Sequence, residues 1–245
     1  MKTIAIIPAR YASTRFPGKP LAMLGEKPMI QWVCERVSAM PELAAAVVAT
    51  DDERIEAAVK GFGGRVMMTS NTHRSGTDRC GEVLNKLESM GEHYDVVINV
   101  QGDEPFVDES QLRALVECFK DESVQIATLK KEIGDQETLM SPNAVKVVTN
   151  KCGEALYFSR YTIPYVRGVE AEHWMEKTKF YKHVGIYAFR SEVLKKLVKM
   201  EQGTLEKMES LEQLRWLEYG YHIKVVETCV ENVGIDTVDY LARAN

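Results

Sequence analysis

The chain is predicted to be an α/β protein with a Rossmann-like, mostly parallel central sheet flanked by helices and a small antiparallel extension. Three observations predict this class. In the first half, short apolar runs alternate with segments of helical periodicity, which is typical of parallel sheets covered on both faces. After residue 124, strand patterns follow one another with few helices between them. The 245 residues are 45% hydrophobic and 27% charged, as in an ordinary globular domain.

The first half contains strands and helices in alternation. The apolar run Ile4–Ile7 predicts the first strand. Pro28–Met40 is a predicted helix, because proline suits a first helical turn and the apolar positions share one face. Asp52 is expected to cap the helix that follows the second strand. The other predicted strands are Ala44–Ala49, Arg65–Met68 and Val96–Val100, and the other predicted helices are Thr77–Met90 and Ser110–Lys120.

The second half is predicted to be richer in strands. Helices return at Ser191–Met200 and Leu211–Tyr219, and a last helix begins at Thr237. No linker or internal repeat divides the sequence, so residues 1–245 are expected to form a single domain, with an extension over about 140–190. The predicted strands are Val124–Leu129, Ala144–Val148, Ala155–Phe158, Val184–Phe189 and Ile223–Val226.

Composition excludes several classes of protein. The formal net charge of −5 argues against nucleic acid as the main partner. The five cysteines are scattered and include no C-x-x-C pair, which argues against a disulfide framework and against structural zinc. The sequence shows neither a signal-peptide core nor a transmembrane stretch. We therefore expect a cytoplasmic protein without a membrane partner.

The loop after the first strand is the strongest functional signal. It carries Arg10, Arg15 and Lys19 among small residues that include Ala9 and Ser13, and the first 25 residues contain no acid. Three cations and a closely approaching backbone suit a polyphosphate. The loop matches neither the Walker pattern G-x-x-x-x-G-K-[ST] nor the dinucleotide-binding pattern G-x-G-x-x-G. The absence of G-x-G-x-x-G excludes a Rossmann oxidoreductase.

Two aspartates follow apolar, glycine-containing segments. Asp103 comes directly after a strand and Gly102, and Asp236 follows the sequence Val-Gly-Ile. Carboxylates in such positions suit Mg²⁺, which prefers carboxylate and phosphate oxygens. The alternative is structural, because Asp103 would also suit a turn and Asp236 the N-cap of the last helix.

Three further segments carry polar groups. Ser75 and Gly76 could present backbone groups to a base, or they could simply begin a capped helix. His183 and Tyr187 share one strand face that would suit a polyol, although a single histidine is more often structural. Glu212 alone predicts a solvated charge on an amphipathic helix. No Ser–His–Asp order, H-E-x-x-H motif or cysteine nucleophile context occurs, which favours chemistry without a covalent enzyme intermediate.

These segments together resemble the nucleotide-sugar cytidylyltransferases, and most of all the branch that activates the eight-carbon sugar acid 3-deoxy-manno-octulosonate (KDO). The first segment occurs in many sugar-nucleotide enzymes, whereas its combination with QGDEP, HVGIYAFR and LEQLR is much more specific. The matching segments, which run from end to end, are IPARYASTRFPGKPLA, VATDDERI, SGTDR, NVQGDEP, ALYFSR with IPY, HVGIYAFR, LEQLRWLE and VGIDT.

The resemblance implies a nucleotidyltransferase fold and a reaction. CTP and KDO would give CMP-KDO and diphosphate, for lipopolysaccharide biosynthesis. The 2-hydroxyl of the sugar would attack the α-phosphorus in line. The resemblance also implies a magnesium cofactor, and a homodimer formed largely through the stretch around 140–190.

The resemblance also implies roles for individual residues. The expected catalytic residues are Arg10, Arg15, Lys19, Asp103 and Asp236, of which the two aspartates bind the metal. The nucleotide would contact the first three of these together with Ala9, Ser13, Arg74, Ser75 and Gly76. The sugar acid would contact Arg79, Gln101, Arg160, His183, Tyr187 and Glu212, with Arg79 or Arg160 suited to its carboxylate.

Some positions depart from the family pattern. Tyr161-Thr162 replaces an expected Ser-Pro pair, and Val238-Asp239 replaces a Pro-Glu start of the last helix. Trp216 and Tyr219 make their helix bulkier than expected. None of these changes removes an expected ligand, but they leave open 8-amino-KDO or a sialic acid as the sugar. A non-catalytic nucleotide-sugar binding protein is disfavoured, because every required polar position is filled.

Overall fold

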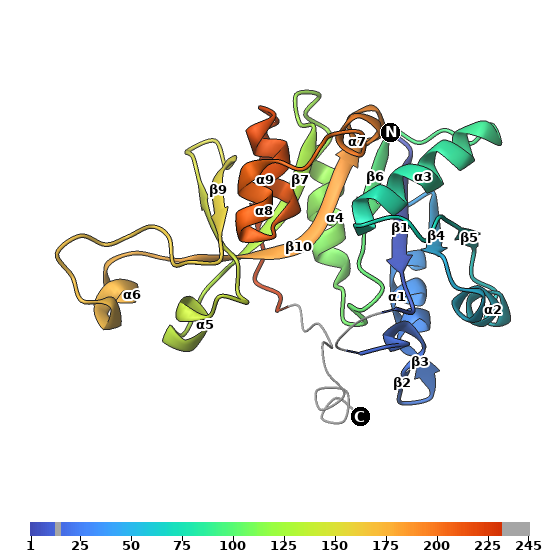
Figure 1. Cartoon of the computed structure of the whole chain (residues 1–245), viewed down its shortest axis with the longest axis horizontal. Coiled ribbons are helices and arrows are strands. Elements are labelled where there is room, and N and C mark those ends of the chain that lie inside the picture. Colours follow the sequence, from blue (N-terminus) through green and yellow to red (C-terminus); the bar gives the residue numbers. More distant parts are fainter. Residues whose placement is uncertain (13–15, 232–245) are drawn as a thin grey trace.

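The structure is a computed structural model that describes residues 1–12 and 16–231. Within these residues one sheet contains seven strands in the order β11–β7–β10–β6–β1–β4–β5, and β8 and β9 extend it from β10 (Figure 1). The strands are β1 (Thr3–Ala9), β4 (Ala45–Thr50), β5 (Val66–Met68), β6 (Val96–Asn99), β7 (Ile126–Glu132), β8 (Lys146–Thr149), β9 (Ala155–Ser159), β10 (Tyr181–Arg190) and β11 (Ile223–Glu227).

Strand direction changes at a single strand of the main sheet. β5, β4, β1 and β6 pair in parallel, as predicted. β10 is antiparallel to both of its neighbours, β6 and β7, while β11 is parallel to β7. In this sheet antiparallel pairing is thus confined to β10 and the β8–β9 extension, in agreement with the predicted small antiparallel extension.

Helices cover both faces of the sheet, as predicted (Figure 1). Strand side chains alternate between the faces, so Ala5 and Ile7 of β1 pack on one side and Ile4 and Ile6 on the other. The first face is covered by α1 (Met29–Ser38), α2 (Glu53–Gly61) and α4 (Glu109–Cys118), and the second by α3 (Gly76–Ser89), α7 (Ser191–Leu197) and α9 (Glu212–Glu218).

The ends of the predicted elements are shifted by no more than three residues, and the helix expected from Thr237 lies outside the described residues. Sequence patterns missed only short elements, because a single turn or a two-residue strand leaves no periodic signal. These are η1 (Lys19–Leu21), β2 (Met23–Leu24), β3 (Lys27–Pro28), α5 (Gln136–Met140), η2 (Ala171–His173), α6 (Trp174–Lys177) and α8 (Thr204–Glu209).

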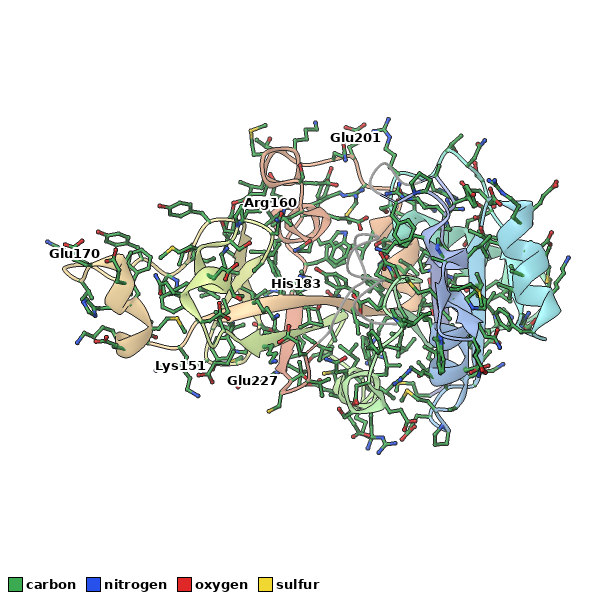
Figure 2. All side chains as sticks on the ribbon, turned by 90° about the horizontal axis from the view of Figure 1, so that it is seen from below. Lys151, Arg160, Glu170, His183, Glu201 and Glu227 are labelled. Carbon is green, nitrogen blue, oxygen red and sulfur yellow. The ribbon has the colours of Figure 1, made fainter. Side chains whose placement is uncertain are left out.

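An arm projects from one end of the sheet. It contains α5, the β8–β9 hairpin and α6, and it has a small core of its own around Leu139, Trp174 and Phe180 (Figure 1). Glu170 lies at its far end, and His183 lies on β10, between the arm and the helical body (Figure 2). No helix of the described chain combines the length and apolar character needed to cross a membrane.

A buried lysine joins the arm's segments. Lys146 on β8 is 0% exposed, and its Nζ donates to the carbonyl oxygens of Ser141 at 2.7 Å and Arg160 at 2.6 Å. Desolvation lowers the pKa of Lys146, because both acceptors are neutral and burial disfavours the charged amine. Lys146 thus ties the segment before β8 to the segment after β9.

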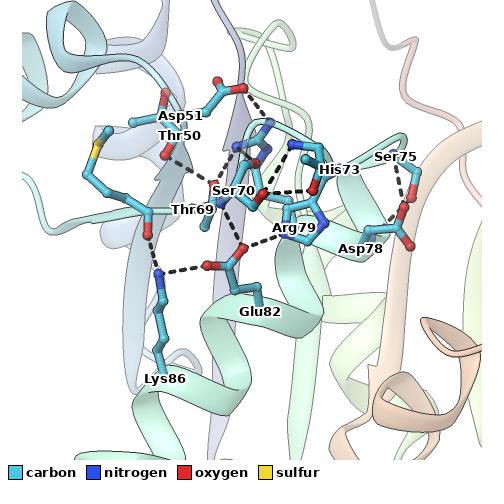
Figure 3. Close-up of polar contacts among 12 residues, drawn as sticks. Thr50, Asp51, Thr69, Ser70, His73, Ser75, Asp78, Arg79, Glu82 and Lys86 are labelled. Carbon is cyan, nitrogen blue, oxygen red and sulfur yellow. Dashed lines mark hydrogen bonds and ion pairs between the residues drawn. The ribbon is translucent and has the colours of Figure 1, made fainter.

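The loop between β5 and α3 is held against α3 by charged side chains (Figure 3). Glu82 accepts hydrogen bonds from the Ser70 amide at 2.9 Å and from the His73 ring, and it pairs with Lys86 at 2.7 Å. Burial opposes ionisation of this carboxyl, but the hydrogen bonds from Lys86, Ser70 and His73 lower the pKa of Glu82 to about 2. The loop thereby reaches the start of α3 in a fixed path.

We expect Lys146→Met to lower the free energy of unfolding by about 2–4 kcal/mol, because two buried carbonyl oxygens lose their donor. Chemical denaturation would measure this change. Lys151→Met, an exposed lysine of the same arm, is the control and should stay near wild type. A Lys146→Met protein as stable as wild type would mean that the cost of burying the amine equals the gain from its hydrogen bonds.

We expect Glu82→Gln to lower the free energy of unfolding at pH 7 by about 2–3 kcal/mol. The folded-state pKa lies below the unfolded-state value, so this contribution is present above about pH 4.5 and declines as the pH falls toward 2. Denaturation of both proteins between pH 7 and pH 3 would test it. The exposed Glu122→Gln serves as control, and a difference that stays constant with pH would contradict the assignment.

Candidate active site

The ends of β1, β4 and β6 meet at one edge of the sheet, where parallel strands usually present ligand-binding loops. The loop after β6 packs directly on the end of β1, since the Gly102 amide donates to the Pro8 carbonyl at 3.2 Å. A Cβ atom at Gly102 would lie 2.9 Å from that same oxygen, so only glycine fits. This contact fixes the position of the next residue, Asp103.

Lys19 returns from the cationic loop to this edge and pairs with Asp103, with 2.6 Å between Nζ and Oδ2. The turn requires Gly18, because its φ is +71° and a Cβ there would lie 3.0 Å from the Tyr11 ring. Lys19 is 7% exposed, whereas the Asp103 side chain is 38% exposed. The pair therefore combines a fixed cation with a carboxylate that is accessible to a ligand.

Asp103 fits a hard cation only in part. It offers an accessible carboxylate, but no group of three or more His, Cys, Asp or Glu side chains gathers as a metal site within the described residues. A metal at Asp103 would thus take further ligands from substrate oxygens or from other parts of the chain. Asp236, the second predicted ligand, lies outside the described residues, as do Ser13 and Arg15.

Two other residues of the predicted phosphate loop are described. Ala9 is the buried last residue of β1, and Arg10 is exposed with no polar partner in the described chain. Sequence reasoning gave no role to Tyr11, whose ring is covered by the Arg54 guanidinium at 3.3 Å. Asp52 holds Arg54 through hydrogen bonds of 2.7 and 2.9 Å. The segment VATDDERI thus supports the phosphate loop from β4 and α2.

The start of α3 lies against the same edge. Ser75 is its N-cap and forms a capping box with Asp78, which confirms the alternative of a capped helix start. A Cβ at Gly76 would lie 3.2 Å from Pro8 and 3.5 Å from the Gln101 amide nitrogen, so the backbone approaches β1 and β6 closely. Arg74 is exposed just before the cap. The segment could therefore serve as helix start and base contact together.

Glu212 connects this helix start to α9. It accepts hydrogen bonds from Ser75 at 2.9 Å and Thr77 at 2.8 Å, and it pairs with Arg215 at 3.1 Å. Burial raises the pKa of Glu212 despite these donors. The prediction of a solvated charge was wrong, because α9 packs its charged face against α3 and α8 instead of exposing it. Gln213 and Arg215 are buried, and Glu212 is partly buried.

Arg79 lies one turn into α3 and is buried (Figure 3). Its guanidinium donates to Thr69 and the Ser70 carbonyl and pairs with Asp51 at 3.1 Å. Both ends of the group are occupied within the protein. The predicted contact with the sugar acid would require these bonds to break, so this geometry favours Arg160 for the sugar carboxylate.

Arg160 follows β9. Among the described residues, no carboxylate forms an ion pair with its guanidinium. Its guanidinium donates to the carbonyl oxygens of Glu209 at 2.7 Å, Pro142 at 3.1 Å and Ser210 at 3.4 Å. These acceptors are neutral, and two of the five guanidinium N–H groups remain. The group could therefore still receive an anion.

His183 and Tyr187 lie on one face of β10, as predicted, with ring centroids 5.2 Å apart. Phe158 contacts the histidine ring edge-on at 5.1 Å. Burial lowers the pKa of His183 to about 3, so the ring is neutral. The Tyr187 hydroxyl is buried and makes no hydrogen bond of normal geometry in the described structure. Burial and the nearby Glu212 carboxylate raise the pKa of Tyr187, and the Thr128 hydroxyl opposes this shift.

A cavity of about 730 Å³ adjoins this cluster. Three segments line it: the loop after β6, through Glu104; the segment before β8; and the first half of β10, which includes His183. A buried hydroxyl without a hydrogen bond of normal geometry, close to a cavity, is typical of a site that binds a polar ligand. The described residues thus form a cation–carboxylate edge at β1 and β6 and a separate polar cluster on β10.

Comparisons with known proteins agree with this architecture. The model of a family described as cytidylyltransferase matches residues 4–225. A 3-deoxy-manno-octulosonate cytidylyltransferase of Phocaeicola vulgatus is 58% identical, covering 100% of this chain and 96% of the relative. One of Bacteroides thetaiotaomicron is 56% identical, covering 100% of this chain and 97% of the relative.

Solved structures show the same likeness. A CMP:2-keto-3-deoxy-manno-octonic acid synthetase complexed with CTP superposes with a TM-score of 0.91 at 43% identity, covering 99% of this chain and 96% of the other. A 4-diphosphocytidyl-2C-methyl-D-erythritol synthase of Anaerococcus prevotii, at 15% identity and a TM-score of 0.63, covers 100% of this chain and 97% of the other and shows the fold alone. The match of the family model and of full-length relatives shows that this chain belongs to the cytidylyltransferase family.

Proposed function

We propose that the protein activates KDO by transferring CMP from CTP to the 2-hydroxyl of the sugar acid, with release of diphosphate. The observation that carries this proposal is the Lys19–Asp103 pair at the carboxyl edge of the parallel strands. It presents a cation and an accessible carboxylate where a nucleoside triphosphate with a divalent cation would lie. The names of the relatives support the choice of CTP and KDO.

The nucleotide half of the site would lie between the phosphate loop and α3. Lys19, the exposed Arg10, and Arg15 would neutralise the triphosphate, with Ala9 and Ser13 lining the loop. Arg74 and the backbone of Ser75 and Gly76 would contact the cytidine. The α-phosphorus is attacked by a weak hydroxyl nucleophile, so reduction of negative charge by fixed cations lowers the barrier.

We assign Mg²⁺ to Asp103 and Asp236, and when bound it would polarise the α-phosphate and acidify the attacking hydroxyl. Glu231, the last described residue, is paired with Lys131 and Lys182 beside His183. In the proposed complex the metal would bind the Asp103 carboxylate, and Lys19, which pairs with Asp103, would lie beside the phosphates.

The sugar half of the site would lie along β10 and the arm. Arg160 supplies a guanidinium for the sugar carboxylate. Polar groups for the sugar hydroxyls would come from His183, Tyr187, Gln101 and Glu212. Because Glu212 also binds Ser75 and Thr77, one carboxylate would connect the base side of the site to the sugar side.

We also infer a homodimer and a cytoplasmic location. The arm exposes large apolar side chains, with Leu156 60% exposed, Tyr161 78% and Tyr165 71%. Exposed apolar side chains on one projecting element suit contact with a second copy of the chain. All five cysteines are free, as expected in a reducing compartment.

The substrate assignment can be tested with purified protein, CTP and Mg²⁺. We expect diphosphate release with KDO and much slower release with a sialic acid, while 8-amino-KDO tests the closest alternative. Turnover of sialic acid alone would overturn the proposal. Calorimetric binding of CTP with no turnover of any sugar acid would favour a non-catalytic nucleotide-sugar binding protein.

We expect Asp103→Asn and Lys19→Met each to lower kcat by about 10²-fold or more, with a smaller change in KM for CTP, because both groups act on charge in the transition state. Steady-state kinetics at saturating Mg²⁺ would measure this. Asp95→Asn, at the opposite end of β6, is the control and should keep normal turnover. Near-normal kcat in Asp103→Asn would remove the metal assignment.

A further inference from the structure

β10 contains a bulge that brings His183 and Tyr187 into contact. Val184 is opposite Leu129 of β7, but Tyr187 is opposite Thr128, so Gly185 and Ile186 are extra residues on β10. Side chains four residues apart on a regular strand are separated by about 13 Å. The two ring centroids are 5.2 Å apart. The bulge, and not strand alternation alone, therefore builds the cluster.

Thr128 fills the inside of this bulge. It is 0% exposed, and its Oγ1 lies 2.8 Å from the Ile186 carbonyl oxygen, 3.2 Å from the Val184 carbonyl oxygen and 2.9 Å from His183 Nε2. The carbonyl oxygens can only accept, so a hydrogen bond to either of them uses the single hydroxyl proton of Thr128. When it points to the nearer one, that of Ile186 at 2.8 Å, His183 Nε2 donates its proton to Oγ1.

This bond pattern fixes the state of His183. The ring is neutral, because burial lowers its pKa to about 3, and it carries a single proton. With that proton on Nε2, Nδ1 is an acceptor, and no other polar contact of the ring occurs in the described structure. His183 also lines the cavity of about 730 Å³. The free acceptor suits a hydroxyl group.

We propose that Thr128 is a positioning residue that locks the β10 bulge and holds His183 as the Nε2–H tautomer, so that Nδ1 accepts a hydrogen bond from a hydroxyl of the sugar acid. The identity of the ligand rests on the proposed function. The tautomer and its dependence on Thr128 do not, since both are properties of the free protein.

The test compares Thr128→Val, which keeps the shape and removes the hydroxyl, with Thr128→Ser, which keeps the hydroxyl. ¹⁵N spectra of histidine-labelled free protein, with His183 assigned through His183→Gln, report which ring nitrogen is protonated. We expect Nε2–H in wild type and Thr128→Ser, and a mixture of tautomers in Thr128→Val. Thr3→Val is a matched control, because the Thr3 hydroxyl is buried without a partner in the described residues.

Kinetics give the second readout. Thr128→Val should raise KM for the sugar acid by about 3- to 10-fold, the value of one neutral hydrogen bond, with little change in KM for CTP. Thr128→Ser should restore it. If Thr128→Val does not fold, as judged by circular dichroism, Thr128→Ala takes its place.

A folded Thr128→Val or Thr128→Ala protein that keeps a pure Nε2–H tautomer and wild-type KM would overturn the proposal. If wild type turned over no sugar acid, the proposed function would fail. The spectra would still decide whether Thr128 sets the tautomer.

Discussion

The site depends on one topological constraint: β10 runs antiparallel between two strands that run the other way. Parallel strands bring only their carboxyl ends to the ligand edge, so a further parallel strand would place its first residues at the opposite edge. β10 is reversed, and Tyr187 pairs with Asn99 at the end of β6 while Arg190 pairs with Val96 at its start. The first half of β10 thus arrives where β1 and β6 end. Residues more than 160 positions from the phosphate loop join it in this way.

Two cationic side chains of the proposed site are held in different ways. Lys19 and Asp103 form a direct ion pair, in which the cation is buried and the carboxylate accessible. Arg160 is instead held by backbone carbonyl oxygens and keeps its charge. The first arrangement suits a ligand that brings both phosphate and a cation, whereas the second suits a ligand that brings an anion alone. The two ends of the site therefore differ in chemistry although both present cations.

Local patterns predicted the parallel core well, because β1 is a continuous apolar run and α1 has a clear apolar period. Asp52 also caps α2 through the Arg54 amide, as expected. Sequence could not predict the His183–Tyr187 contact, since it requires a bulge against β7, 55 residues away from His183. It also misjudged Glu212. An amphipathic pattern shows which side chains share a face, but it does not show that a second helix will bury the charged face. Thr128 carried no signal at all, because a threonine in a β-strand is ordinary.

The arm contributes to the site through the backbone as well as through side chains. Ser210, between α8 and α9, has a φ of 53°, a left-handed conformation that costs a non-glycine residue about 1 kcal/mol or more. Such strain persists only where neighbours fix the chain. Arg160 does so by donating to the carbonyl oxygens of Glu209 and Ser210, and the Glu209 carboxylate accepts the Arg160 amide in return. Glu212 follows two residues later and binds Ser75 of α3. Arg160, the residue suited to the sugar carboxylate, therefore also fixes the turn that places Glu212 against Ser75. One connected set of hydrogen bonds would thus position both proposed substrates.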